Sequence, residues 1–185
     1  MVITISGVPG SGKTSVGKIV AQKLGWPFYS VGALSTEIAL KRGLTLDELH
    51  AIDEHDSTTD NYLDAYQTEL GRNQDNFVIE GRLSWHFIPK SFKIFLDCDT
   101  KEAARRTLIS KVDRPDEKIP PDLATIEQGI VDRLASDDRR YKKYYDLDYL
   151  DKKNYDLVLD TTDLKGVGAV AKAIIQALPE VIQHR

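Results

Sequence analysis

The feature that most constrains the fold is a glycine-rich segment close to the start of the chain. It reads GVPGSGKT, from Gly7 to Thr14. The apolar run before it (1–6) is typical of a buried strand, and apolar residues recur after it at helical spacing, at 16, 19, 20 and 24. A strand that turns into a helix through such a loop predicts an α/β fold in which backbone N–H groups converge on one anion.

The segment matches the pattern G-x-x-x-x-G-K-[ST], which holds nucleotide phosphates when it joins a strand to a helix. We predict that Lys13 pairs with the β- and γ-phosphates of ATP and that the Thr14 hydroxyl is a ligand of Mg²⁺. The predicted ATP-binding residues are Gly7, Val8, Pro9, Gly10, Ser11, Gly12, Lys13, Thr14 and Ser15. The predicted cofactor is Mg²⁺, with ATP as the phosphate donor.

The rest of the chain alternates between strand and helix patterns. Further apolar runs at 26–30, 76–80, 92–97 and 155–160 are continuous, as expected for parallel strands covered on both faces. Apolar residues at helical spacing from 164 to 178 predict a C-terminal helix, and Thr45 followed by Glu48 predicts a capping box. This alternation predicts an α/β fold with a parallel sheet between helical layers.

Two stretches interrupt the alternation. Residues 31–72 are mostly polar and helical and predict an inserted helical subdomain. Residues 111–122, KVDRPDEKIPPD, carry three prolines and predict a mobile loop between two helices.

Composition excludes several classes of protein. The formal net charge of −4 argues against a protein that relies on sequence-independent nucleic-acid binding. The single cysteine, Cys98, excludes an internal disulfide and a Cys-rich zinc site. No apolar run approaches the length of a membrane span and no basic leader precedes the first strand, so we expect a cytoplasmic protein without a membrane partner.

The sequence lacks the Asn-Lys-x-Asp motif of GTPases and the Leu-Ser-Gly-Gly motif of ABC ATPases, which leaves a small kinase.

Arginines lie on both sides of the proline-rich loop. Arg105 and Arg106 precede it; Arg133, Arg139 and Arg140 follow it. Arg133, Asp137 and Arg140 are spaced i, i+4, i+7 and share a helix face. Arginine matches phosphate oxygens bidentately, so we favour phosphate binding over the alternative of a solvated face of ion pairs.

The stretch FVIEGRLSW (77–85) is a second candidate site segment. It ends a strand at Glu80, turns at Gly81 and presents Arg82 at the carboxyl edge of the sheet, where ligands bind in open α/β folds. We predict that Glu80 orients a metal-bound water and that Arg82 meets an acceptor; the alternative for Arg82 is a surface ion pair. The histidines give no metal motif, and EHD at 54–56 is interpreted as a solvated helix turn.

Together these stretches resemble the cytidylate kinases, in the short form common in archaea, within the nucleoside monophosphate kinase group. The resemblance runs nearly end to end and is most specific in EGRL (80–83) and in the segment 139–162. It implies one domain (1–185) with a three-layer core like that of P-loop nucleoside-triphosphate hydrolases (1–30, 73–106 and 126–185), a nucleoside-monophosphate-binding insert at about 31–72 and a lid at about 107–125. It also implies a monomer that transfers the ATP γ-phosphate to CMP or dCMP.

The resemblance assigns roles residue by residue. The implied catalytic residues are Lys13, Arg106, Arg133 and Arg140, with Arg106 as a phosphate-binding arginine before the lid. The implied acceptor-binding residues are Gly32, Arg82, Asp137 and Arg140.

The sequence departs from the family pattern at Thr36, where an arginine usually holds the acceptor phosphate. Loss of such a charged contact weakens binding by about 1.5–3 kcal/mol unless another arginine replaces it. The longer bacterial forms also carry an acidic base-reading residue where this chain has Thr107. Two alternatives therefore stay open. One is a kinase of the same fold for AMP, UMP or a small hydroxyl metabolite; a plain hydroxyl acceptor would need a carboxylate base, for which Asp53, Asp56 and Glu80 are candidates. The other is a nucleotide-binding module with little transferase activity.

Overall fold

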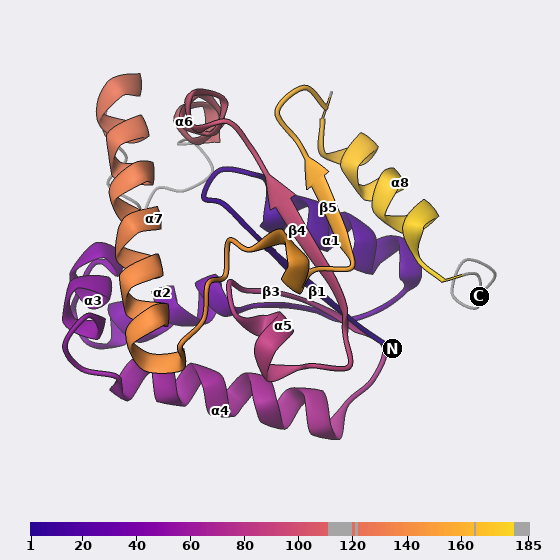
Figure 1. Cartoon of the computed structure of the whole chain (residues 1–185), viewed down its shortest axis with the longest axis horizontal. Helices are drawn as coiled ribbons and strands as arrows, with labels where there is room; N and C mark the ends of the chain where they lie inside the picture. The colour runs from indigo at the N-terminus through magenta and orange to yellow at the C-terminus, as the bar shows by residue number, and fades with distance from the viewer. Residues whose placement is uncertain (111–119, 121, 165, 180–185) are drawn as a thin grey trace.

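The structure is a computed structural model that describes residues 1–110, 120, 122–164 and 166–179 (Figure 1). Five strands form one sheet in the order β2-β3-β1-β4-β5, and every neighbouring pair is parallel. The strands are β1 (Val2–Gly7), β2 (Phe28–Ser30), β3 (Phe77–Glu80), β4 (Phe92–Asp97) and β5 (Leu157–Asp160). Each lies on one of the five predicted apolar runs, so the predicted parallel α/β fold is confirmed.

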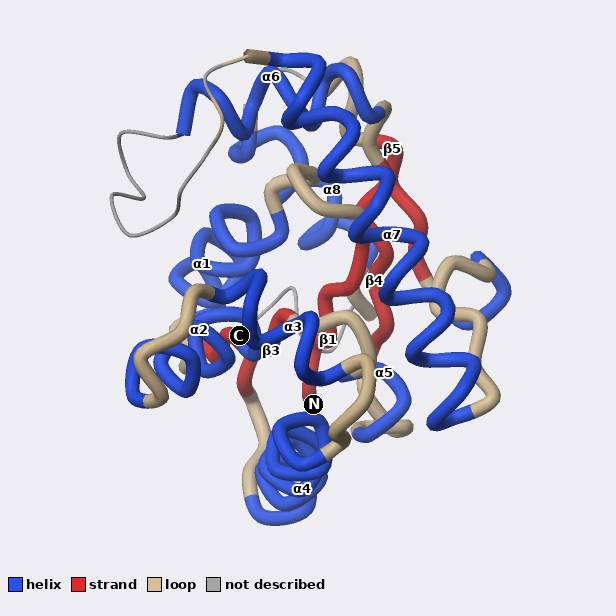
Figure 2. The backbone as a smooth tube through the Cα atoms, turned by 90° about the vertical axis from the view of Figure 1, so that its left-hand side faces the viewer, coloured by secondary structure: helices blue, strands red, loops and turns tan. Residues whose placement is uncertain are grey.

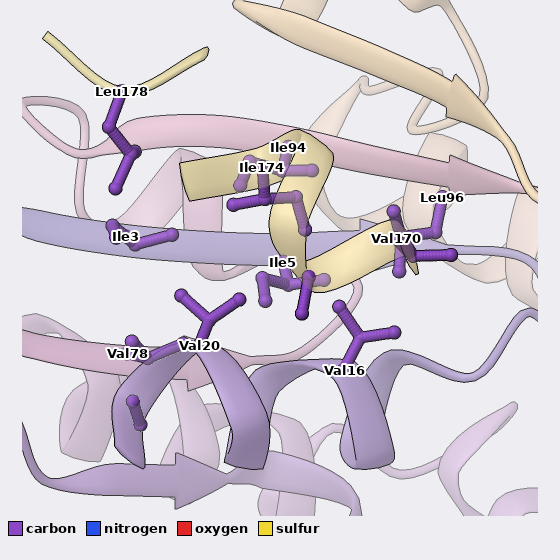
Figure 3. Packing of buried hydrophobic residues seen from close by; sticks show 12 residues of the cluster. Ile3, Ile5, Val16, Val20, Val78, Ile94, Leu96, Val170, Ile174 and Leu178 are labelled. Atoms are coloured by element: carbon purple, nitrogen blue, oxygen red, sulfur yellow. The ribbon is translucent and has the colours of Figure 1, made fainter. Parts of the chain in front are cut away.

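One face of the sheet is covered by α1 (Lys13–Leu24) and α8 (Val167–Ala177), the two helices that apolar spacing predicted. Figure 3 shows their side chains meeting those of the central strands. Ile3 and Ile5 of β1 are fully buried there against Val16, Val20 and Ile174. Each such side chain contributes about 1.5–3 kcal/mol through burial of apolar surface.

The other face is covered by α4 (Thr58–Asn73), α5 (Ser84–Phe87), α6 (Thr100–Ile109) and α7 (Leu123–Tyr145). Alternate strand residues point to this side: Phe77 and Ile79 pack against Leu70 of α4, and Phe95 packs with Ile126 and Ile130 of α7. Figure 1 shows α4 running below the sheet, and Figure 2 shows it nearly end-on. The sheet between two helical layers confirms the predicted three-layer architecture.

The segment 31–72 contains α2 (Val31–Lys41), α3 (Leu46–Asp53) and most of α4. The predicted capping box is present at the start of α3: the Thr45 hydroxyl accepts from the Glu48 backbone N–H (3.2 Å), and the Glu48 carboxylate accepts from the Thr45 N–H (2.7 Å). The division of the chain into core, insert and lid is not tested by this architecture and stays a prediction. The predicted proline-rich loop falls almost wholly outside the described residues.

Candidate active site

The glycine-rich loop joins β1 to α1 through a turn that needs glycine. Gly7 has φ +144°, and a Cβ there would lie 2.1 Å from the Leu96 carbonyl oxygen. Gly10 has φ +76°, and its Cβ would lie 2.8 Å from the Ala103 carbonyl oxygen. The close approach to β4 and α6 therefore holds the loop in its curled shape. Within it, the Ser11 hydroxyl donates to the Val8 carbonyl at 2.9 Å.

Lys13, the first residue of α1, lies in the field of two arginines, Arg82 and Arg133, and of two carboxylates, Glu80 and Asp137. Its ammonium donates to the Val8 carbonyl at 2.7 Å. Burial, and next the charge of Arg82, lowers the pKa of Lys13 to about 7; Arg133 acts in the same direction and Glu80 opposes it. Positive charges gathered at the mouth of a phosphate-binding loop favour an anion there.

Glu80 and Thr14, predicted to serve the metal, lie side by side. The Thr14 hydroxyl donates to Glu80 Oε1 at 3.3 Å, and the Ser30 hydroxyl donates to the same oxygen. Mg²⁺ prefers oxygen ligands and is usually held by one or two protein groups together with water and phosphate oxygens. The buried carboxylate and the neighbouring hydroxyls fit that ion. The described His, Cys, Asp and Glu residues form no group of three or more that could hold a metal ion.

A cavity opens beside the loop, between the carboxyl edge of the sheet, the helices of the segment 31–72 and α7. Among the predicted site residues, it brings together Lys13, Gly32, Glu80, Arg82, Arg133 and Arg140. The parallel register explains part of this convergence, because Glu80 is paired with Ile5 of β1, two residues before Gly7. Ligand-binding residues from distant parts of the chain thus meet at one edge of the sheet.

Asp137 holds two of the cavity arginines in place. It is 3% exposed; its Oδ2 lies 2.5 Å from Arg82 Nε and its Oδ1 lies 3.3 Å from Arg140 Nη2. Arg82 therefore makes an ion pair, but a mostly buried one rather than the surface pair of the alternative interpretation. Arg140 also lies 3.6 Å from Asp53 and 3.6 Å from Asp60.

Thr36, at the position of the family arginine, is not among the residues that line the cavity. Its hydroxyl donates to the Gly32 carbonyl of its own helix at 3.0 Å. Lys41 pairs with Glu37 at 2.7 Å, and Arg42 donates to the Thr59 hydroxyl at 3.2 Å. The cations that line the cavity are instead Lys13, Arg82, Arg133 and Arg140.

Arg106 lies outside this cavity. Its guanidinium donates to Glu102 (2.8 Å) and to the Thr161 carbonyl (2.6 Å) and hydroxyl (3.0 Å), and its Nη2 also reaches the Thr162 carbonyl (3.2 Å). The Thr161 hydroxyl in turn donates to the Asp97 carbonyl at 2.8 Å. Arg106 thus fastens the loop after β5 to α6, and its predicted contact with a phosphate stays a prediction.

Arg105 and Arg139 make exposed ion pairs, which is the alternative interpretation of the basic clusters. Arg105 pairs with Glu102 on the surface at 2.7 Å, and exposed Arg139 lies 3.6 Å from Glu54. Thr107, at the position of the acidic residue in the longer forms, donates to the Ala103 carbonyl at 2.8 Å.

Sequence reasoning missed several residues that line the cavity. They come from α3 and α4 and include His50, Asp60, Asp64 and Gln67. Partial burial, and next the charges of Arg133 and Arg82, lowers the pKa of His50 to about 2, so this imidazole is neutral. The spacing of Asp60 and Asp64, i and i+4, was the available signal, but it resembles that of any solvated helix.

Of the three bases considered for a hydroxyl acceptor, Asp53 and Glu80 line the cavity. Asp56 does not; it caps the start of α4 by accepting from the Thr58 N–H at 2.9 Å.

Fold and cavity define a class of protein. A loop for nucleotide phosphates opens beside a second cavity rich in arginine, which is the arrangement of a P-loop kinase with a small acceptor. A shikimate kinase from Bacteroides thetaiotaomicron shares this fold with a TM-score of 0.64, over 95% of this chain and 97% of its own, at 19% identity.

The model of the cytidylate kinase-like family matches residues 2–163. A cytidylate kinase from Methanocella arvoryzae is 40% identical over 183 residues, 98% of each chain. Another, from Archaeoglobus fulgidus, is 34% identical over 171 residues, 92% of this chain and 91% of the relative. The chain belongs to the cytidylate kinase-like family, and the predicted resemblance is confirmed.

In the ranges that the structure describes, no helix combines the length and apolar character needed to cross a bilayer.

Proposed function

We propose that the protein transfers the γ-phosphate of ATP to CMP or dCMP and so forms the nucleoside diphosphate and ADP. The proposal rests on one observation: Lys13 of the glycine-rich loop lines the same cavity as Arg82, Arg133 and Arg140. An acceptor whose phosphate meets these cations lies next to the γ-phosphate of a donor held by the glycine-rich loop. The relatives named cytidylate kinase support the same acceptor.

The chemistry needs little beyond position and charge. A phosphate oxygen of the acceptor attacks the γ-phosphorus in line, and the bond to the β-phosphate oxygen of ADP breaks. A phosphate monoester has a second pKa of about 6, so at neutral pH the nucleophile is already ionised and no general base is required. This removes the role of Asp53 or Glu80 as a base.

Each cavity residue has a distinct task in this proposal. Backbone N–H groups of the loop and Lys13 hold the β- and γ-phosphates, while Arg133 and Arg140 compensate charge on the transferring group. Arg82 holds the acceptor phosphate, with Asp137 fixing its direction. For Arg106 to contact the phosphates, its guanidinium must first give up its hydrogen bonds to the carbonyls of Thr161 and Thr162.

Thr14, and Glu80 through a water, would hold Mg²⁺. When bound, this ion supplies positive charge that neutralises the β- and γ-phosphate oxygens. We further propose that the protein works in the cytoplasm as a monomer, with nucleotides rather than nucleic acid as its partners.

The test is an assay of ADP formation from MgATP with CMP, dCMP, UMP, AMP and no acceptor in parallel. We expect strong stimulation by CMP or dCMP. Lys13→Met should abolish transfer while leaving the fold intact, so that its far-UV circular dichroism spectrum matches that of the unaltered protein. Equal ADP formation with and without every monophosphate would contradict the proposal and favour a nucleotide-binding module.

A further inference from the structure

The acceptor cavity is lined by both cations and carboxylates. Its cations are Lys13, Arg82, Arg133 and Arg140, and three of its carboxylates, Asp53, Asp60 and Asp64, come from the segment 31–72. Asp60 and Asp64 project from one face of α4, since they are four residues apart. A nucleotide whose phosphate meets the cations would have these carboxylates within the same cavity as its nucleoside part.

Asp60 is a cavity carboxylate with a buried oxygen, Oδ2, that lacks a hydrogen-bond donor in the described part of the chain, as does Oδ1 of Asp53. It is 7% exposed, and among the described residues nothing donates a hydrogen bond to its Oδ2. Arg140 Nε lies 3.6 Å from this oxygen, which is beyond hydrogen-bond length. Asp64, in contrast, accepts from the Tyr145 hydroxyl at 2.6 Å. A buried carboxylate oxygen without a donor is costly, and a ligand that brings a donor removes the cost.

The bases of the two common pyrimidine nucleotides differ at this kind of contact. Cytosine carries an exocyclic amine at C4, which donates, whereas uracil carries a carbonyl oxygen there, which accepts. A carboxylate oxygen binds the amine and repels the carbonyl. Adenine also carries an amine, so a carboxylate separates cytosine from uracil, while exclusion of AMP depends on the size of the cavity.

We propose that Asp60 selects a cytosine acceptor over a uracil acceptor by accepting a hydrogen bond from the exocyclic amine. The inference rests on the proposed function and names the residue that sets its specificity. Burial raises the pKa of Asp60 to about 6; the charge of Arg140 opposes this rise and that of Asp53 reinforces it. Asp60 reads the base and touches no reacting atom.

The experiment compares the unaltered protein with Asp60→Asn, using MgATP and CMP, dCMP, UMP or dUMP. The asparagine amide keeps the size of the side chain and adds an N–H donor, which can meet the uracil carbonyl. We expect the ratio of kcat/KM for CMP to that for UMP to fall about tenfold or more, mainly through KM. The ratio of CMP to dCMP should stay unchanged.

Asp56→Asn is the matched control, because Asp56 is exposed, precedes the same helix and lies outside the cavity, and it should leave both ratios unchanged. An unchanged ratio of CMP to UMP in Asp60→Asn would overturn the inference. So would a change confined to the ratio of CMP to dCMP, because Asp60 would then read the ribose.

A second experiment uses only the unaltered protein, so its outcome does not depend on whether a variant folds. A CMP analogue with hydrogen in place of the C4 amine should lose about tenfold or more in kcat/KM relative to CMP, and equal values would overturn the inference. Failure of the proposed function looks different: the unaltered protein would then phosphorylate none of the pyrimidine monophosphates.

Discussion

At the scale of single residues, Asp137 links the stability of the fold to the site. It is the ion-pair partner of Arg82, whose side chain is 17% exposed, and of Arg140, whose side chain is 6% exposed. Asp137→Ala leaves buried guanidinium groups without this partner, so we expect the free energy of unfolding to fall by about 3 kcal/mol or more. Urea unfolding measures this change.

The neighbouring Asp138 provides the control. It pairs with Lys142 at 3.0 Å on the outer face of α7, so Asp138→Ala should cost less than about 1 kcal/mol. Equal losses for the two variants would show that Asp137 does not organise the arginines.

Lys13 should couple nucleotide binding to proton uptake. Its pKa of about 7 in the ligand-free protein lies below that of an unfolded lysine, about 10.4. The unfolded state therefore binds more protons between these values, so the contribution of Lys13 to stability rises as the pH rises through that window. ATP phosphates restore its charge, and we expect uptake of a substantial fraction of a proton per MgATP at pH 8.

Calorimetric titrations of MgATP in buffers of different ionisation enthalpy measure this uptake. Lys13→Met should remove it, since methionine has no group to titrate. Binding without any proton exchange at pH 8 in the unaltered protein would contradict the prediction.

At the scale of elements, Glu54 fastens α3 to α7. Its carboxylate accepts from the Ser136 hydroxyl, and its backbone carbonyl accepts from Lys143 Nζ at 3.1 Å and from the Tyr144 hydroxyl at 3.3 Å. These contacts hold one wall of the acceptor cavity against another. Glu54→Ala removes the hydrogen bond from Ser136, worth about 0.5–1.5 kcal/mol, together with the exposed ion pair to Arg139, and should raise the KM of the acceptor about two- to tenfold.

Steady-state kinetics with CMP varied at saturating MgATP checks the prediction, and kcat should change little. Glu37→Ala is the control, because Glu37 pairs with Lys41 on the exposed side of α2. An unchanged acceptor KM in Glu54→Ala would mean that α3 needs no tie to α7.

The sequence predicted those helices and strands that carry a clear apolar pattern. The five strands, α1 and α8 were all expected, because the sequence of each carries a continuous run or a regular stripe of apolar residues. The helix α5 was missed because its four residues are too few to show periodicity. The short 3₁₀ helix Lys152–Asn154 was missed for the same reason.

At the scale of the whole molecule, the order of the strands brings the site together. The parallel pairing of β1 with β3 places Glu80 3.3 Å from Thr14, although 66 residues separate them in the chain. Sequence motifs predicted the loop and several arginines, because glycine, lysine and arginine at these spacings are rare and their chemistry is specific. The cavity carboxylates of α4 could not be predicted in that way. Asp60 and Asp64 resemble surface residues in the sequence, and only their contacts with Arg140 and Tyr145 of α7 distinguish them.

The central claim is that the phosphate leaves ATP for CMP rather than for water. The most direct measurement is chromatographic separation of the nucleotides after incubation with MgATP and CMP, with CDP and ADP quantified together. The account predicts equal amounts of CDP and ADP, and very little ADP when CMP is omitted. ADP formed without CDP would contradict it.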